Sequence, residues 1–333
     1  MKTGISYYGN RIPKHVEEDL IDAVNHGCNF VVHTFSEEDY QFYQGTMVEI
    51  IKISHKLGLE VYIDPWGVGG VFGGEAYSHL VAENLNVRQI LSDGRSPAAA
   101  CMNNENFRTY MRNWIEVAVE IGGDVIFWDE PRFYQAKGNE KKNVWSCRCE
   151  TCKKLFREHY GYEMPSDFTE DVKDFKQSKF LAFVQEMSKL VHQKGKKTAI
   201  CLLPFEIAEL SAVDWEEIAK IESLDILGTD PYWVNRGKGV EDYVTFYSKK
   251  VFDLARKYNK EPQIWIQVFN IPKGREPEVE TAVRVAYEEG LRNLAAWSYG
   301  GAGHMSCIRS ENPELVWKIL GKSYKDCICK NRA

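Results

Sequence analysis

The segment Val125-Ile126-Phe127-Trp128-Asp129-Glu130-Pro131 is an apolar run that ends in two adjacent carboxylic acids. Its branched and aromatic residues are typical of a strand that is buried on both faces. Pro131 cannot continue a hydrogen-bonded ladder, so the strand is expected to end there. Acids at the end of a buried strand face a cleft, where a carboxyl group can donate or accept a proton. We therefore predict that Asp129 and Glu130 are catalytic.

A second acid follows another apolar segment in the same manner. The sequence Leu227-Gly228-Thr229-Asp230-Pro231-Tyr232 again places an acid, a proline and an aromatic residue after a short buried strand. Two carboxyl groups on either side of a bond suffice for an acid to protonate a leaving oxygen and for a base or nucleophile to act opposite it. Asp230 is the predicted partner of Glu130. A role for Asp230 as a ligand of a substrate hydroxyl or as a helix cap stays open.

These acids need a scaffold that brings the ends of distant strands together. Eight short apolar segments alternate with longer amphipathic ones, and this repeat predicts an α/β fold of the (β/α)8 TIM-barrel class. An open doubly wound sheet is disfavoured because no strand leads through a glycine-rich phosphate loop into a helix. The predicted strands are Thr3–Tyr8, Asn29–Phe35, Glu60–Trp66, Asp124–Asp129, Lys197–Pro204, Asp225–Asp230, Gln263–Phe269 and Asn293–Tyr299, and the predicted helices include Lys14–His26, Tyr40–Leu57, Phe107–Ile121, Gln177–Lys194, Asp242–Tyr258 and Pro277–Gly290.

Two connections are too long for simple barrel loops. We interpret residues 67–106 and 131–168 as insertions on the catalytic face of a single domain that spans residues 1–333. The segment 67–74 contains five glycines but lacks the Lys-Ser/Thr ending of a phosphate loop, so we predict a flexible active-site loop. Glu75, which follows it, is a reserve candidate acid.

Other strand ends carry residues that suit sugar recognition. Flat aromatic rings can stack on the C–H faces of a sugar, while Asp, His and Gln exchange hydrogen bonds with its hydroxyl groups. Each such residue alone could equally belong to the barrel core, and it is their shared position at strand ends that indicates binding. The predicted substrate-binding residues are Tyr7, His33, Asp64, Trp66, Tyr232, Gln267, Trp297 and Tyr299.

Three thiols fall within six residues in the segment Cys147-Arg-Cys149-Glu-Thr-Cys152, directly after the acid pair. Thiolates select zinc, and a tetrahedral site requires four ligands. Cys101 lies in the other long insertion and is the predicted fourth ligand. A four-thiolate site has no open position, so we predict structural Zn²⁺ that joins the two insertions.

Residues Cys101 to about Lys194 resemble the zinc-containing bacterial β-galactosidases of glycoside hydrolase family 42. The similar features are Cys101 before Met-Asn-Asn-Glu-Asn-Phe-Arg, the strand that ends in an acid pair, the three clustered cysteines and the later Tyr160-Gly161. The resemblance implies a (β/α)8 barrel, Glu130 as the general acid/base and the four cysteines as ligands of structural zinc. The chain departs from that family at Asp129, where the family has Asn, and at Gln267, near its strand-seven glutamate nucleophile.

The sequence thus predicts a glycoside hydrolase acting on a small carbohydrate, with two enzymatic alternatives and one of another class. The pair Asp129-Glu130 also looks like the site of enzymes that cleave N-acetylhexosamines with the substrate acetamido group as nucleophile. A zinc-dependent hydrolase or lyase would need an open position at the cysteines. A sugar-binding barrel without hydrolytic activity would explain the presence of Gln267 instead of an acid.

Composition limits the partners. The net charge is −6 with both signs mixed along the chain, which disfavours nucleic acid and anionic membranes as partners. The first twenty residues include Arg11, Lys14, Glu17 and Glu18, so they lack the apolar core of a signal peptide, and no apolar run is long enough to span a bilayer. We expect a cytoplasmic protein, and the family resemblance suggests a homo-oligomer.

Overall fold

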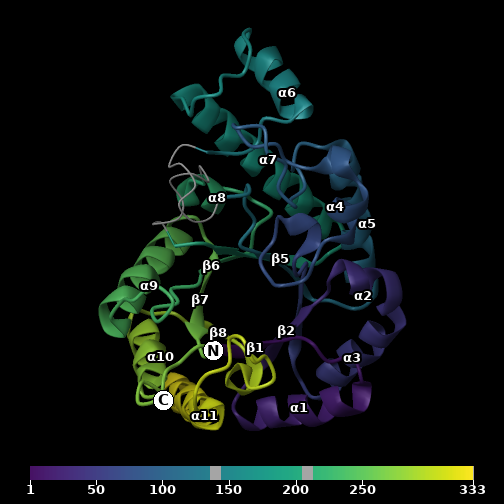
Figure 1. Ribbon diagram of the computed structural model, residues 1–333. Helices are drawn as coiled ribbons and strands as arrows, with labels where there is room; N and C mark the ends of the chain where they lie inside the picture. Colours follow the sequence, from purple (N-terminus) through teal and green to yellow (C-terminus); the bar gives the residue numbers. More distant parts are fainter. Residues whose placement is uncertain (136–143, 205–212, 333) are drawn as a thin grey trace.

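Eight parallel strands close into a barrel in sequence order (Figure 1). The computed structural model describes residues 1–135, 144–204 and 213–332. This arrangement confirms the predicted fold class, a (β/α)8 TIM barrel. The strands are β1 (Lys2–Tyr7), β2 (Phe30–Thr34), β3 (Glu60–Asp64), β4 (Val125–Asp129), β5 (Lys197–Leu202), β6 (Ile226–Thr229), β7 (Glu261–Gln267) and β8 (Asn293–Trp297).

The helices form a ring outside the barrel, and α6 lies beyond this ring (Figure 1). None of those that the structure describes is long and apolar enough to cross a membrane. The α-helices are α1 (Pro13–Asn25), α2 (Glu37–Phe42), α3 (Gln44–Lys56), α4 (His79–Glu83), α5 (Glu105–Glu120), α6 (Glu150–Tyr160), α7 (Glu170–Gln193), α8 (Trp215–Ala219), α9 (Val240–Lys257), α10 (Glu278–Glu288) and α11 (Pro313–Arg332).

One helical prediction needs correction. The helix predicted over Tyr40–Leu57 is interrupted at Tyr43, and its first part begins earlier because Ser36 and Asp39 form a capping box. At the other end of the chain, Cys327 and Cys329 belong to α11. Tyr324 of this helix is buried, and its hydroxyl donates a hydrogen bond to the carbonyl oxygen of Gly4 in β1, 3.0 Å away. This contact attaches the helix to the barrel.

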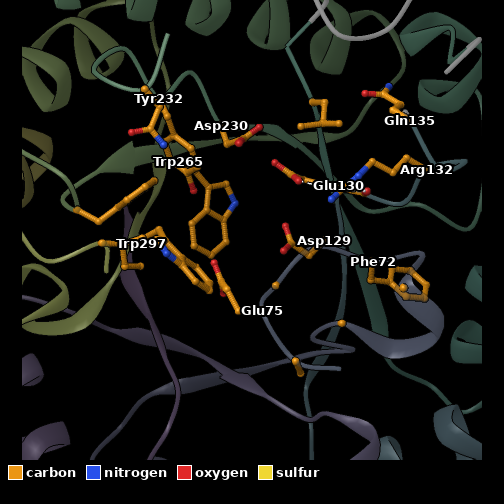
Figure 2. Close-up of a pocket in the computed structure, with 18 of the residues that line it drawn as sticks. Phe72, Glu75, Asp129, Glu130, Arg132, Gln135, Asp230, Tyr232, Trp265 and Trp297 are labelled. Carbon is orange, nitrogen blue, oxygen red and sulfur yellow. Dashed lines mark hydrogen bonds and ion pairs between the residues drawn. The ribbon is translucent and has the colours of Figure 1, made fainter. Parts of the chain in front are cut away.

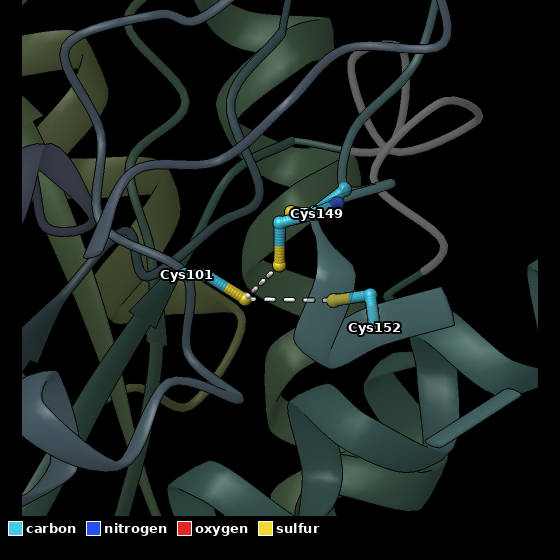
Figure 3. A group of neighbouring side chains, drawn as sticks. Cys101, Cys149 and Cys152 are labelled. Atoms are coloured by element: carbon cyan, nitrogen blue, oxygen red, sulfur yellow. Dashed lines mark hydrogen bonds between the residues drawn. The ribbon is translucent and has the colours of Figure 1, made fainter. Parts of the chain in front are cut away.

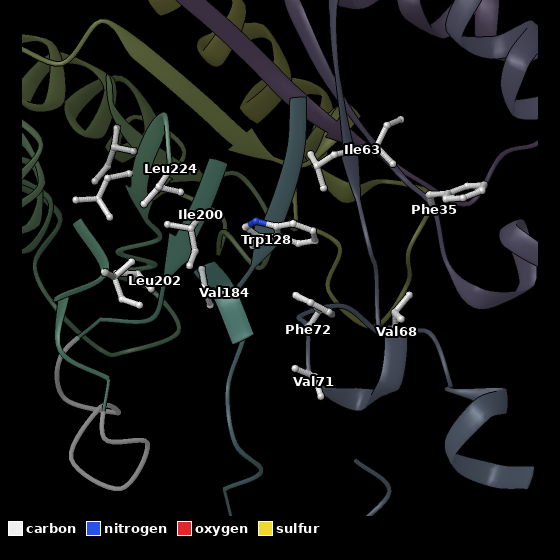
Figure 4. Packing of buried hydrophobic residues seen from close by; sticks show 14 of the residues in the cluster. Phe35, Ile63, Val68, Val71, Phe72, Trp128, Val184, Ile200, Leu202 and Leu224 are labelled. Carbon is white, nitrogen blue, oxygen red and sulfur yellow. The ribbon is translucent and has the colours of Figure 1, made fainter. Parts of the chain in front are cut away.

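The core has two layers, because successive strand residues point to opposite faces of the barrel wall. Residues on the outer face pack against the helices; Trp128, for example, lies among Ile200, Val184 and Phe72 (Figure 4) and donates a hydrogen bond to Ser188 of α7. Inward-facing residues fill the barrel interior. They include Phe30, Val32, Tyr62, Val125, Phe127, Ala199, Cys201, Ile226, Trp265 and Ala295. The interior is therefore packed below the catalytic face.

The glycine-rich segment 67–74 is built into the core, in contrast to the flexible loop predicted for it. Val68, Val71 and Phe72 are buried, and the Phe72 ring stacks on Trp128 with centroids 5.8 Å apart. The Gly69 amide donates to the carboxylate of Glu37 at 2.8 Å. Apolar anchors between the glycines therefore hold the loop against the barrel.

Candidate active site

A cavity of about 640 Å³ opens at the carboxyl ends of the strands (Figure 2). Its wall combines acids, arginines and aromatic side chains, and its residues come from the carboxyl-terminal parts of strands β4 to β8 and from both long insertions. Lining residues include Phe72, Glu75, Phe127, Asp129, Glu130, Arg132, Tyr134, Gln135, Asp230, Tyr232, Asn235, Arg236, Trp265, Phe269, Asn270 and Trp297. Five of the predicted site residues thus share one cavity: Asp129, Glu130, Asp230, Tyr232 and Trp297.

The carboxyl groups of Asp129, Glu130 and Asp230 point toward one another in this cavity, and Glu75 approaches them from the glycine-rich loop (Figure 2). Burial raises the pKa of Asp129 and of Asp230, and the nearby Glu130 raises both further. The pKa of Glu75 is also raised, chiefly by burial. A raised pKa favours the protonated form of a carboxyl group, which suits it to general acid catalysis.

Asp64 lies at the end of β3 with 1% of its surface exposed, and it is not part of the cavity wall. Burial raises its pKa well above the ordinary value, with Asp129 as the next largest cause. Its Oδ1 atom has no hydrogen-bond partner among the described residues. Asp64 therefore lies behind the cavity wall, close enough to Asp129 that the two carboxyl groups disfavour each other's ionisation.

Replacing Asp64 with Asn is expected to stabilise the protein at neutral pH. A carboxyl whose folded-state pKa is raised contributes stability at low pH and loses it as the pH rises through that pKa. Asn carries no such charge, so the variant should match wild type near pH 4 and exceed it by about 1 kcal/mol or more at pH 8. Urea denaturation at both pH values measures this, with Asp326→Asn on the exposed face of α11 as control. A loss of stability at pH 8 would show that ionised Asp64 has favourable partners.

Glu130 occupies an unusual backbone conformation and has a cationic partner. Its φ of 39° lies in the left-handed region, which costs a non-glycine residue on the order of 1–3 kcal/mol. Its amide donates to the carbonyl oxygen of Cys201 at 3.0 Å. The Arg132 guanidinium lies 2.8 Å from both the Oε2 atom and the carbonyl oxygen of Glu130. Together these contacts fix the direction of the carboxylate.

Gly73 is required for the position of Asp129. Its amide donates to the carbonyl oxygen of Asp129 at 2.9 Å, and a Cβ atom on Gly73 would lie 2.2 Å from Asp129 Oδ2. We expect Gly73→Ala to displace this carboxyl and to lower kcat on the substrate at least about tenfold, with little change in overall fold. Gly45→Ala is the control, since nothing lies within 4 Å of its new Cβ. Equal activity of the two variants would contradict a precise role for Asp129.

Three aromatic rings form the side of the cavity opposite the acids. Trp265 and Trp297 come from the ends of β7 and β8, and Tyr232 follows β6 (Figure 2). Trp297 stacks on Tyr8 with centroids 4.9 Å apart, and Tyr8 in turn contacts Trp66 at 5.2 Å. Trp66 therefore supports the wall from behind instead of lining it. The rings offer flat apolar surfaces beside polar groups.

Tyr7, His33 and Tyr299 were predicted to bind substrate, but they lie outside the barrel wall. The hydroxyl groups of Tyr7 and Tyr299 donate to Asp19 of α1 at 2.6 and 3.1 Å. His33 Nε2 lies 2.9 Å from Ser54 Oγ of α3, and burial lowers the pKa of this histidine to about 3. Tyr7 and His33 are adjacent in the strand register and both occupy outward positions. These residues attach helices to the barrel.

Gln267 is fully buried and does not line the cavity. Its amide group donates to Asn235 Oδ1 and to the carbonyl oxygen of Phe269, and it accepts from the Val234 amide, all at 3.0 Å. Asn235 and Phe269 do line the cavity. Gln267 was predicted to bind substrate, and instead it holds two residues of the cavity wall in place.

Several wall residues were missed by the sequence analysis. Trp265 could have been found, because it lies two residues before Gln267 and therefore shares its inward face. Arg132 and Arg236 lie in loops, where periodicity gives no signal. Glu206, an acid that follows the predicted strand Lys197–Pro204 in the sequence, lies outside the described residues.

The four predicted zinc ligands come together although they belong to different insertions. Figure 3 labels three of them, Cys101, Cys149 and Cys152. The sulfur atoms of Cys101, Cys147, Cys149 and Cys152 all lie within 4.8 Å of one another. Cys101 Sγ is 3.5 Å from Cys152 Sγ and 3.6 Å from Cys149 Sγ. A tetrahedral zinc site with bonds of about 2.3 Å has sulfur–sulfur edges of roughly 3.8 Å. The buried cluster therefore fits a metal ion.

The surroundings of the cluster suit negatively charged thiolates. The backbone and side-chain amides of Asn103 donate to Cys101 and Cys152 at 3.4 and 3.3 Å, and the Cys149 amide donates to Cys147 at 3.4 Å. Lys176 is buried nearby; burial lowers its pKa to about 7, while its electrostatic attraction to Cys147 and Cys152 raises it. Such donors orient thiolates and offset their charge.

The cluster also braces the cavity. Gln89 joins the same two insertions: it donates to the carbonyl oxygen of Ala100 and accepts from the Tyr134 amide at 3.0 Å and from Ser146 Oγ at 2.6 Å. Tyr134 lines the cavity, whereas Ala100 and Ser146 each adjoin a cysteine of the cluster. Loss of the cluster would therefore disturb one wall of the site.

No protein-family model matches the chain, and a sequence search of curated proteins finds no match. Solved structures match over nearly its whole length. The endo-1,4-β-mannanase from Rhizomucor miehei has a TM-score of 0.63 at 12% identity, covering 98% of this chain and 95% of that one. GH5_18 from Streptomyces cattleya in complex with GlcNAc gives 0.56 at 11%, covering 98% and 80%.

A different kind of sugar enzyme is also similar. D-allulose 3-epimerase from Methylomonas sp. has a TM-score of 0.53 at 10% identity, covering 100% of this chain and 98% of that one. At these identities the likeness extends to the fold alone. The chain shares the (β/α)8 barrel with glycoside hydrolases and with sugar epimerases.

Proposed function

We propose that this protein is a glycoside hydrolase that cleaves a small oligosaccharide or glycoside, with Glu130 and Asp230 as its catalytic carboxyl pair. The observation that carries the proposal is the convergence of these two acids, from strands β4 and β6, on one cavity. They are close enough that Glu130, after burial, is the largest cause that raises the pKa of Asp230. Glycosidic bond cleavage uses such a pair with one shared proton.

The aromatic wall supports a sugar as the substrate. Trp265, Trp297 and Tyr232 face the carboxyl groups across the cavity, so a pyranose ring stacked on them would present its anomeric carbon to the acids. A cavity of about 640 Å³ holds a small ligand and not a long polymer segment.

In this proposal the zinc ion would have a structural role. Held by four thiolates, Zn²⁺ has no position for water or substrate, and it would supply rigidity to the insertions. The protein's own carboxyl groups carry the chemistry.

A second candidate function is favoured by the position of Asp129. This acid is adjacent to Glu130, lines the same cavity and is fixed there by the close approach of Gly73. In a substrate-assisted N-acetylhexosaminidase, Asp129 would orient the acetamido group of the substrate while that group attacks the anomeric carbon. Asp230 would then contact hydroxyl groups only.

A panel of nitrophenyl glycosides that includes N-acetylglucosaminide and N-acetylgalactosaminide tests both functions. Release of nitrophenol from plain hexosides would support the Glu130–Asp230 pair. Cleavage confined to acetamido sugars would favour the role of Asp129. If no glycoside of any kind is cleaved but sugars bind, the hydrolase proposal is wrong and a sugar-binding barrel replaces it.

A further inference from the structure

Glu130 and Asp230 have opposite electrostatic surroundings. The Glu130 carboxylate is paired with Arg132, whose guanidinium contacts Oε2 at 2.8 Å, and the Glu130 side chain retains 19% of its exposure to solvent. Asp230 is 5% exposed, has no ion pair among the described residues, and its Oδ1 atom lacks a hydrogen-bond partner there. A buried carboxyl without a cation favours its neutral form, whereas one paired with an arginine favours its ionised form.

The other titratable groups that face Glu130 are mainly acids, so its ion pair with Arg132 is the contact that distinguishes it from Asp230. Four acids lie around it: Asp129 on β4, Asp64 on β3, Glu75 in the glycine-rich loop and Asp230 after β6. The thiol of Cys201 on β5 is also near, and burial raises its pKa well above the ordinary value. Of the described residues that line the cavity, the cations are Arg132 and Arg236. Arg236 is exposed at the rim and only partly offsets the effects that raise the pKa of Asp230.

We propose that Arg132 is a positioning residue that keeps Glu130 as a carboxylate, so that Asp230 holds the catalytic proton and Glu130 acts as the nucleophile or base. This inference rests on the proposed hydrolase function and reverses the roles that the family resemblance implies. The same arginine holds both the backbone carbonyl and the side chain of Glu130, so it fixes the left-handed conformation of that residue as well.

Asp230 supplies the proton for cleavage and Glu130 acts on the anomeric side. The bond between the anomeric carbon and the leaving oxygen breaks, and the oxygen keeps the electron pair and takes the Asp230 proton. In an inverting route the Glu130 carboxylate removes a proton from the attacking water, and that proton returns to Asp230 through the contact between the two acids. In a retaining route Glu130 bonds to the anomeric carbon, and ionised Asp230 later takes the proton of the water that releases the sugar.

The assignment is tested without any substrate by ¹³C NMR of protein labelled at glutamate Cδ and aspartate Cγ. Comparison with Glu130→Gln and Asp230→Asn identifies the two signals. We expect the Glu130 carbon to show an ionised carboxylate at pH 6 while the Asp230 carbon remains protonated. In Arg132→Met, which removes the ion pair, the Glu130 carbon signal at pH 6 should change, and Arg132→Lys, which keeps the charge, should restore most of the wild-type behaviour. Protonated Glu130 beside ionised Asp230 at pH 6, or an unchanged Glu130 signal in Arg132→Met, would overturn the proposal.

An activity measurement separates the roles in a second way. Aryl glycosides with a dinitrophenyl leaving group need little acid assistance, whereas methylumbelliferyl glycosides need more. Asp230→Asn should therefore lose on the order of 10²-fold or more in kcat/KM on the methylumbelliferyl substrate and less than about tenfold on the dinitrophenyl one. Glu130→Gln should lose activity on both equally.

The opposite pattern would make Glu130 the acid and overturn the inference. Wild-type protein without activity on any glycoside would instead refute the proposed function, and the NMR titration would still decide which acid holds the proton. Circular dichroism of Arg132→Met and Arg132→Lys shows whether each is folded before either result is interpreted.

Discussion

Replacing Glu130 with Gln is expected to lower kcat/KM on a cleaved glycoside by about 10³-fold or more. The amide has almost the same shape as the carboxylate, so the variant should keep the backbone hydrogen bond to Cys201 and the packing of the cavity. It cannot form a glycosyl bond or accept a proton from water, and it loses the ion pair with Arg132. Steady-state kinetics on the best substrate of the nitrophenyl panel measures the effect.

The control for this variant is Glu49→Gln, which makes the same chemical change on the exposed face of α3. It should retain wild-type kinetics. Both variants should have wild-type metal content and circular dichroism, which shows that any loss in Glu130→Gln is chemical. Near-normal turnover by Glu130→Gln would remove Glu130 from the catalytic pair.

Loss of one thiolate of the cysteine cluster has the second large expected effect, on stability. We expect Cys149→Ser to release most of the bound metal and to lower the free energy of unfolding by on the order of 3 kcal/mol, or roughly 5–10 °C in Tm. The reason is that Cys101 and the three later cysteines would be joined through one ion, which adds to the hydrogen bonds between the two insertions such as those of Gln89. Thermal unfolding and metal analysis of purified protein measure both changes.

Kinetics of the same variant distinguish a structural from a catalytic metal. At temperatures where Cys149→Ser is folded, KM should rise because Tyr134 and Gln135 line the cavity on the braced insertion, while kcat should change little. Cys307→Ser is the matched control, since this exposed thiol lies outside the cluster. A complete loss of kcat with unchanged Tm would instead indicate that the metal acts on the substrate.

The barrel could be predicted from sequence because its strands are short apolar runs in regular alternation with amphipathic helices. Each predicted strand overlaps an observed one, and Glu60, Lys197 and Asn293 begin strands as expected. The ends of strands were less certain. The predicted β1 extends to Tyr8, one residue beyond the observed end.

That single residue matters at the site, because strand residues alternate between the two faces of the wall. Tyr8 faces the interior and stacks on Trp297, whereas Tyr7 points to α1. Both are tyrosines in an apolar run, so residue type gave no means of choosing between them. The acids were predicted more reliably, since Asp129 and Asp230 mark strand ends themselves through the prolines that follow.

Contacts between loops could not be derived from sequence in the same way. The pairing of Glu130 with Arg132 depends on a turn with a positive φ at a non-glycine residue, which no propensity indicates. The cysteine cluster was an exception, because the chemistry of thiolates links residues that are 46 to 51 positions apart. The preference of zinc for thiolates thus predicted a contact between distant parts of the chain, which hydrophobic periodicity cannot do.

Catalysis by the Glu130–Asp230 pair is tested most directly by hydrolysis of a glycoside in H₂¹⁸O, followed by mass spectrometry of both products. Wild-type protein should place ¹⁸O on the reducing sugar and leave the released alcohol unlabelled, because water adds to the anomeric carbon. The Glu130→Gln protein should yield neither product above background. Label in the released alcohol, or equal turnover by the Glu130→Gln protein, would contradict catalysis by the Glu130–Asp230 pair.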